Sequence, residues 1–205
     1  MKKGNVVVES RLMSNNQSDG VNHGGVPEFD KASPFALLSI TPLFFIDHEI
    51  LKQNYRLLQE TLHPDRYPLQ SKEAEIACLM ASAINQAYAV LQDPLQRAKA
   101  LLLLKGGAIP GASGQTICDP RFMDEALDLK ELLEAAQTAE SCAQLISALS
   151  EKERQVGELF QDAFLANDLT AMSDAYIRLS FVVKTKNDAA CALTEMGIGD
   201  YAPSA

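Results

Sequence analysis

The first half of the chain carries two stretches in which apolar residues recur with the period of an α-helix. In the first stretch, the apolar positions are Leu51, Tyr55, Leu58 and Leu62. Asp47 stands where a carboxylate can cap the first amides, and Ile46 and Leu51 occupy the two positions of a hydrophobic staple. In the second stretch, which follows Ser71, one apolar face is formed by Ile76, Leu79, Ala83, Ala87 and Val90. These patterns predict two helices that face each other.

The residues between the two patterns cannot continue either helix. The segment 63–70 contains Pro64 and Pro68, and a proline lacks the amide donor that a helix interior requires. The sequence therefore predicts a helical hairpin with an exposed turn at its tip. The tripeptide His63-Pro64-Asp65 lies in that turn.

A third helix is predicted directly after the hairpin. Asp93 is a suitable N-cap, Pro94 occupies the first helical position, and Gly106 and Gly107 mark the end. The run from Leu101 to Leu104 is typical of a buried helix.

The second half of the chain predicts a bundle of three helices. Their expected ranges are Pro120 to about Ala136, about Ser141 to Ala166, and Asp168 to Met196. The second helix has an apolar face at Leu145, Leu149, Val156, Leu159 and Ala163, and the third at Leu169, Met172, Tyr176, Leu179 and Val183. Gly197 supplies a C-terminal stop. The connections around Thr138 and Asn167 are short, which favours antiparallel neighbours. The predicted fold class is all-α, a helical hairpin followed by an antiparallel three-helix bundle.

The first bundle helix carries apolar residues in two places. One stripe is expected to face the core and consists of Phe122, Ala126, Leu129 and Leu133. Met123 and Leu127 lie off this stripe, beside the carboxylates of Asp124, Asp128 and Glu131. Apolar residues among carboxylates suggest a partner-binding patch. The alternative is that they pack against the hairpin or widen the core.

Composition and charge narrow the range of partners. The chain has 205 residues, and its 47% hydrophobic content is sufficient for one or two cores. A formal charge of -9 and a pI near 4.8 oppose nonspecific binding to nucleic acid, which requires a basic surface. Protein partners are therefore favoured.

Membrane and metal signals are weak in this sequence. No stretch approaches the roughly 20 apolar residues that span a bilayer. Val6-Val7-Val8 is shorter than a secretory apolar region of roughly 7 to 15 residues, so a cytoplasmic location is expected. The four cysteines are Cys78, Cys118, Cys142 and Cys191. Their spacing fits neither a metal site nor an iron–sulfur cluster, so reduced thiols and no bound metal are expected.

Composition also divides the chain into segments. Residues 1–32 are polar and rich in glycine, which predicts a disordered tail. Residues 33–106 hold the hairpin and the third helix, and residues 107–118, with their glycines and a proline, predict a linker. Residues 119–197 hold the bundle, and 198–205 form a short tail.

Four segments of the first domain resemble the J-domain family of co-chaperones. They are Tyr55-Arg56, His63-Pro64-Asp65-Arg66, Ile84-Asn85-Gln86-Ala87-Tyr88 and Leu91-Gln92-Asp93-Pro94. The resemblance implies that the turn engages a DnaK-like ATPase chaperone and stimulates its ATP hydrolysis. It also implies that Asp65 pairs with an arginine of the partner while Pro64 holds the turn rigid. The implied chaperone-binding residues are His63, Pro64, Asp65, Arg56, Lys52 and Arg66.

The chain departs from many J domains just ahead of the tripeptide. Lysines are common there in the family, whereas this chain has Leu57, Glu60 and Thr61. The difference implies a weakened docking face for a general-purpose chaperone.

Two further segments narrow the resemblance to HscB, the J-domain co-chaperone of iron–sulfur cluster assembly. They span residues 94–106 and 119–131. The resemblance implies that the bundle binds the scaffold protein IscU and that the hairpin brings IscU to the chaperone HscA, which binds the ATP. The implied scaffold-binding residues are Met123, Leu127, Asp128, Glu131 and Phe181. Asp124 stands where family members often have a hydrophobic residue.

Three other functions are open to the same sequence. His63 and Asp65 could serve acid–base catalysis, but no nucleophile or oxyanion arrangement accompanies them, and a turn between helices is not a cleft. A J-domain protein could instead serve a general chaperone and unrelated clients, which binding to IscU rather than to unfolded peptides would exclude. A purely structural helical protein would fail to stimulate an ATPase.

Overall fold

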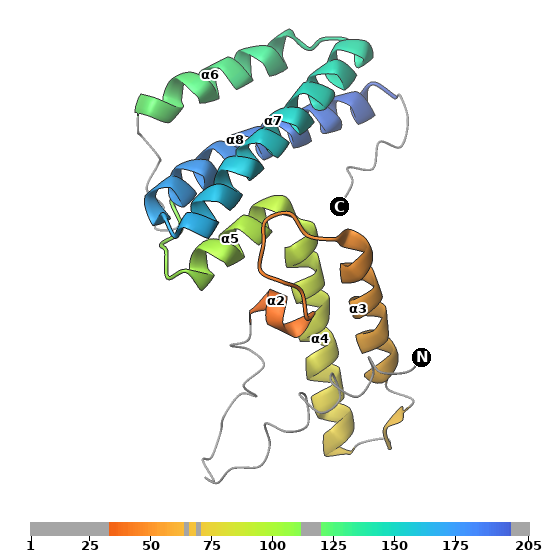
Figure 1. Cartoon of the computed structure of the whole chain (residues 1–205). Coiled ribbons are helices and arrows are strands. Elements are labelled where there is room, and N and C mark those ends of the chain that lie inside the picture. Colours follow the sequence, from red (N-terminus) through yellow and green to blue (C-terminus); the bar gives the residue numbers. More distant parts are fainter. Residues whose placement is uncertain (1–32, 64–65, 69–70, 112–119, 198–205) are drawn as a thin grey trace. The chain divides into compact units, whose positions relative to one another are not determined.

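The structure, a computed structural model, describes residues 33–63, 66–68, 71–111 and 120–197. These residues contain seven α-helices and no strand (Figure 1). The helices are α2 (Pro34–Leu37), α3 (His48–Thr61), α4 (Lys72–Gln92), α5 (Pro94–Leu104), α6 (Pro120–Ala135), α7 (Ala139–Ala166) and α8 (Leu169–Glu195). The predicted all-α fold is confirmed. The predicted tails and most of the predicted linker lie outside the described residues.

Both helices of the hairpin begin at a side-chain cap, and the predicted cap at Asp47 is confirmed. The Asp47 carboxylate accepts hydrogen bonds from the amides of Glu49 at 2.9 Å and Ile50 at 3.1 Å. The Ser71 hydroxyl accepts one from the amide of Ala74 at 3.1 Å. Each cap satisfies amides that have no partner inside the helix, which explains why α3 and α4 start where they do.

An aromatic stack and a shared amide join α3 to α4. The rings of Tyr55 and Tyr88 stack with centroids 4.1 Å apart. The Tyr55 hydroxyl donates to Asn85 Oδ1 at 3.0 Å, and the Gln59 amide donates to the same oxygen. The predicted core face of α3 is confirmed at Leu51, Leu58 and Leu62, which are buried.

The buried face of α4 lies to one side of the face that the sequence predicts. Ile76 and Leu79 are 44% and 56% exposed, and the face that is buried consists of Ala77, Met80, Ile84, Ala87 and Leu91. The prediction is confirmed at Ala87 and wrong at Ile76 and Leu79, because apolar residues occupy more than half of the circumference of α4. Periodicity alone therefore could not select the side that meets the neighbouring helices.

Because α4 is so rich in apolar residues, it departs from the expectation that no stretch of the chain could span a membrane. It has 21 residues, and its mean hydropathy of 1.3 over 18 residues is sufficient, with its length, for a membrane-crossing helix. The expectation that no stretch approaches such a span is therefore wrong for α4. Core helices of soluble proteins meet the same criterion, and α4 contacts α2, α3 and α5.

Helix α5 begins at its predicted cap and carries a buried cation. The Asp93 carboxylate accepts from the amides of Leu95 and Gln96 at 2.8 and 2.9 Å. Arg97 is buried, and its guanidinium donates to three carbonyls: Leu91 at 2.8 Å, Phe44 at 2.8 Å and Gln92 at 3.2 Å. Only the first half of the leucine run is buried, because Leu101 and Leu102 face inward while Leu103 and Leu104 are exposed.

The segment between α2 and α3 contacts α7 through Phe44. Its ring lies 5.5 Å from that of Phe160, and a Cβ atom on Gly157 would overlap it. The next amide, that of Phe45, donates to Gln161 Oε1 at 3.0 Å. Gly157 therefore allows an aromatic ring to lie directly against the backbone of α7.

In the bundle, α7 and α8 form the most extensive helix pair. Between them and α6 lies a buried cluster that includes Leu129, Cys142, Leu149, Val182 and Leu193. The predicted core faces are confirmed at most positions, but Leu159 and Leu169 are exposed, and Tyr176, Ala126 and Leu133 are only half-buried. Asn167 adopts the left-handed conformation at the turn, and Gly197 follows α8 with φ +73°.

Replacement of Gly157 by alanine tests this packing. In an exposed helix interior, the change should stabilise the fold by about 1 kcal/mol because glycine is a poor helix former. Here the new methyl group would overlap Phe44. We expect Gly157→Ala to lower the free energy of unfolding by about 1 to 3 kcal/mol, as overpacking does. Urea denaturation followed by circular dichroism measures this change.

The control is the same substitution in a Phe44→Ala background. Without the ring, the added methyl group meets open space and should raise stability. An increase in stability from Gly157→Ala in the parent protein would contradict the proposed overlap.

Candidate protein-interaction surfaces

The tip of the hairpin presents His63 at the surface. Helix α3 ends at Thr61, and His63 is exposed two residues later. The amide of Arg66 donates to the His63 carbonyl at 3.0 Å, and the Tyr67 hydroxyl donates to the Thr61 carbonyl at 3.3 Å. These bonds hold Arg66 and Tyr67 close to the C-terminal end of α3. Pro64 and Asp65 themselves lie outside the described residues.

The three cations expected in the chaperone contact are exposed. Lys52 and Arg56 lie one turn apart on α3, so their side chains share one face, and Arg66 is exposed in the turn. Leu57, at a position where many J domains carry lysine, is exposed as well. The Thr61 hydroxyl is occupied by a bond to the Leu57 carbonyl at 2.8 Å. The exposed surface of α3 thus combines cations with apolar groups.

The second surface is the outer side of α6. Met123 and Leu127 are 53% and 55% exposed, and Asp124, Asp128 and Glu131 are exposed beside them. The alternative that these two apolar residues belong to the core is therefore wrong. The opposite stripe of α6 meets the core through Phe122 and Leu129, which are buried.

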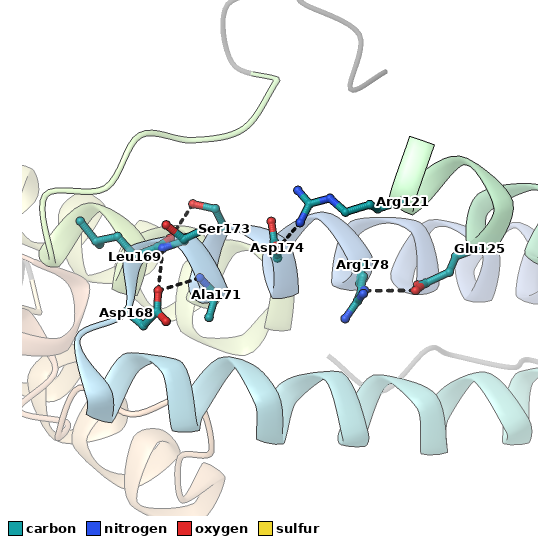
Figure 2. A network of polar contacts seen from close by, with 9 residues as sticks. Arg121, Glu125, Asp168, Leu169, Ala171, Ser173, Asp174 and Arg178 are labelled. Carbon is teal, nitrogen blue, oxygen red and sulfur yellow. Dashed lines mark hydrogen bonds and ion pairs between the residues drawn. The ribbon is translucent and has the colours of Figure 1, made fainter. Parts of the chain in front are cut away.

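Two ion pairs hold α6 against α8 (Figure 2). Arg121 reaches Asp174 at 3.2 Å, and Glu125 reaches Arg178 at 3.2 Å. Both pairs join residues 53 positions apart (174 − 121 and 178 − 125), so α6 and α8 run in the same direction. The guanidinium carbons of Arg121 and Arg178 also lie 5.1 and 5.5 Å from the centre of the Phe122 ring. These contacts fix the rotation of α6 and therefore which of its residues face outward.

Phe181 differs from the other residues expected in the patch. It is half-buried and packs against the core cluster of the bundle. The constant offset between α6 and α8 places it level with Asp128 along the shared direction. Phe181 therefore lies level with the exposed residues of α6 along the axis of the bundle, although part of its side chain packs against the core.

Sequence reasoning missed a groove between the hairpin and the bundle. It encloses about 910 Å³ and is lined by residues of both signs, among them His48, Lys52, Glu153 and Lys186. Lys186 pairs with Glu153, and burial followed by the charge of Arg97 lowers the pKa of His48. Because the positive and negative side chains of the groove neutralise one another, the groove favours neither anionic nor cationic ligands. The sequence signal that could have located this groove is Arg97, a cation one turn ahead of the apolar Leu101 on α5.

Metal-binding chemistry finds no support in the described part of the chain. No group of three or more His, Cys, Asp or Glu side chains there could hold a metal ion. Cys78 and Cys191 are exposed, Cys142 is buried, and all three are free thiols. Cys118 lies outside the described residues.

Comparison with known proteins adds a family context. A family model described as the HSCB C-terminal oligomerisation domain matches residues 118–190. A co-chaperone protein HscB homolog from Vibrio cholerae serotype O1 is 32% identical over 162 residues, which cover 75% of this chain and 92% of the relative. A homolog of the same name from Burkholderia thailandensis is 34% identical over 122 residues, 59% of this chain and 69% of the relative.

Two solved structures are similar as well. The chaperone HscB from Vibrio cholerae matches with a TM-score of 0.67 and 30% identity, covering 80% of this chain and 99% of the other. The human co-chaperone protein HscB matches with a TM-score of 0.72 at 21% identity, covering 89% of this chain and 98% of the other. The second likeness concerns the fold alone.

Proposed function

Because the chain belongs to the HscB family of co-chaperones, we propose that it delivers the scaffold protein IscU to the DnaK-like chaperone HscA during iron–sulfur cluster biogenesis. One observation carries this proposal. Met123 and Leu127 are exposed on α6 in the same chain as an exposed His63 at the tip of a helical hairpin. A chain with two separate contact surfaces can bring two proteins together.

The hairpin supplies the chaperone contact in this proposal. His63, Pro64 and Asp65 engage HscA and stimulate its ATPase, and Lys52 and Arg56 on α3 and Arg66 in the turn add positive charge to the same contact. The position of His63 beyond the end of α3 and the exposure of the three cations support this role. ATP binds to HscA, and the chain itself acts as an activator rather than an enzyme.

The bundle supplies the scaffold contact. Met123 and Leu127 form an apolar anchor, Asp128 and Glu131 orient a basic region of IscU, and Phe181 extends the surface from α8. Apolar side chains that lose water on binding contribute most of the affinity of such interfaces, while charges at the rim steer association. We assign the J domain to residues 33–106 and the scaffold-binding bundle to 119–197, in a protein of the cytoplasm.

The loop assignment predicts a loss of activation without a loss of fold. His63→Gln or Asp65→Asn should abolish stimulation of HscA, because the contact requires those particular side chains. His63 is exposed, so the free energy of unfolding should change by less than about 0.5 kcal/mol in that variant. A single-turnover ATPase assay and thermal denaturation test both expectations, and normal stimulation by either variant would exclude the assignment.

The surface of α3 predicts selectivity between chaperones. With Leu57 and Thr61 in place of lysines, stimulation of a housekeeping DnaK should be weak at a concentration that saturates HscA. Parallel ATPase titrations of the two chaperones provide the measurement. Equal activation of both would favour the alternative of a general J-domain co-chaperone.

The scaffold assignment predicts that binding depends on the apolar anchor. Met123→Ala combined with Leu127→Ala should weaken IscU binding by more than about 1 kcal/mol, measured by calorimetry. Adding Phe181→Ala should weaken it further. The triple variant should still stimulate HscA in the absence of scaffold, because the hairpin is unchanged.

Leu132→Ala is the matched control. Leu132 is 53% exposed on the same helix, but it lies about half a turn away from Met123. Its truncation should leave IscU affinity unchanged. If Leu132→Ala weakens binding as much as the anchor variant does, the contact does not lie on the proposed side of α6.

A further inference from the structure

The outer side of α6 consists of two adjacent rows. Met123 and Leu127 form an apolar row, and Asp124 and Asp128 form an acidic row one residue further along the helix. Residues three or four apart on a helix have Cβ atoms about 5 to 6 Å from each other. Asp124 is therefore beside Leu127, which is three residues further on, and it directly follows Met123 in the chain. A partner that covers Met123 and Leu127 also removes water from around Asp124.

The charges of the acidic row are not balanced within the described part of the chain. The side chains of Asp124, Asp128 and Glu131 take part in no ion pair or hydrogen bond there. The nearby cations are occupied, since Arg121 pairs with Asp174, Lys130 with Glu134, and Arg178 with Glu125.

This arrangement is unfavourable for the isolated helix. Asp124 and Asp128 are like charges four residues apart, and Asp128 and Glu131 are like charges three residues apart. Such pairs destabilise a helix, and no contact of these side chains with the described residues offsets that effect. Local unfavourable choices of this kind are expected where function requires them.

We infer that Asp124 selects the scaffold by pairing with a lysine or arginine that IscU places beside the Met123–Leu127 anchor. This inference rests on the proposed function and specifies its chemistry. A carboxylate that is covered without a counter-charge opposes binding, whereas a cation with suitable geometry makes a charge-assisted hydrogen bond. Asp124 thereby excludes partners that present only apolar groups at this position, and Glu131 at the edge mainly affects the rate of association.

The test is a calorimetric titration of the full chain with IscU at low and moderate salt. Asp124→Asn keeps the shape of the side chain and removes its charge, and we expect about tenfold weaker binding or more. Asp124→Leu, which enlarges the apolar row, should also weaken binding. Asp162→Asn is the matched control, because Asp162 is exposed on α7, outside the proposed surface, and this variant should bind as the parent does.

The outcomes separate this inference from the proposed function. If the parent chain does not bind IscU, the proposed function fails and the inference fails with it. If the Met123→Ala and Leu127→Ala variant loses binding while Asp124→Asn binds as tightly as the parent, the scaffold site stands and the inference is overturned. Tighter binding by Asp124→Leu would also overturn it, because the partner would then present an apolar group.

Discussion

The packing of Phe44 against the backbone of α7 is the constraint on which the connection between the two halves of the described chain depends. Phe44 belongs to the segment that leads into α3, and its ring fits against α7 because residue 157 has no side chain. The carbonyl of Phe44 accepts a hydrogen bond from Arg97, and the amide of Phe45 donates one to Gln161. A single short segment is thus bonded to α5 on one side and to α7 on the other. Both bonds use backbone groups, so the geometry depends on the path of the chain more than on the identity of residue 45.

Arg97 explains how a charge can be buried at this connection. A buried cation is costly by several kcal/mol unless its hydrogen bonds are satisfied. Three carbonyls satisfy the guanidinium, and two of them, those of Leu91 and Gln92, belong to the end of α4. These carbonyls have no hydrogen-bond partner inside α4. The Arg97 side chain therefore satisfies the end of α4 while the carbonyls satisfy its buried guanidinium. Burial lowers the pKa of Arg97 to about 10, opposed by the charges of Asp93 and Glu153, which leaves the guanidinium charged at neutral pH.

The sequence was sufficient to predict features that depend on a few neighbouring residues. The caps at Asp47 and Asp93 follow from local spacing and are confirmed. For Met123 and Leu127 the sequence left two alternatives open, and their exposure decides between them. The core face of α4 was not predictable in this way, because Ile76 and Leu79 are as apolar as the residues that are buried. The same holds for the contact of Gly157 with Phe44, which joins residues more than a hundred positions apart. Such contacts depend on how elements pack, and a periodic pattern contains no information about a distant partner.

The position of α6 explains how apolar side chains can be exposed there at little cost to the fold. Helix α6 contacts α8 and, less extensively, α7, whereas α8 contacts α5, α6 and α7. A helix with neighbours on one side needs only one apolar stripe, and Phe122 and Leu129 provide it. The ion pairs of Arg121 and Glu125 then fix its rotation. The remaining circumference makes no contribution to the core, so residues such as Asp124 can be chosen for a partner. An edge helix held by one stripe and two ion pairs can change its specificity while the bundle beneath it is preserved.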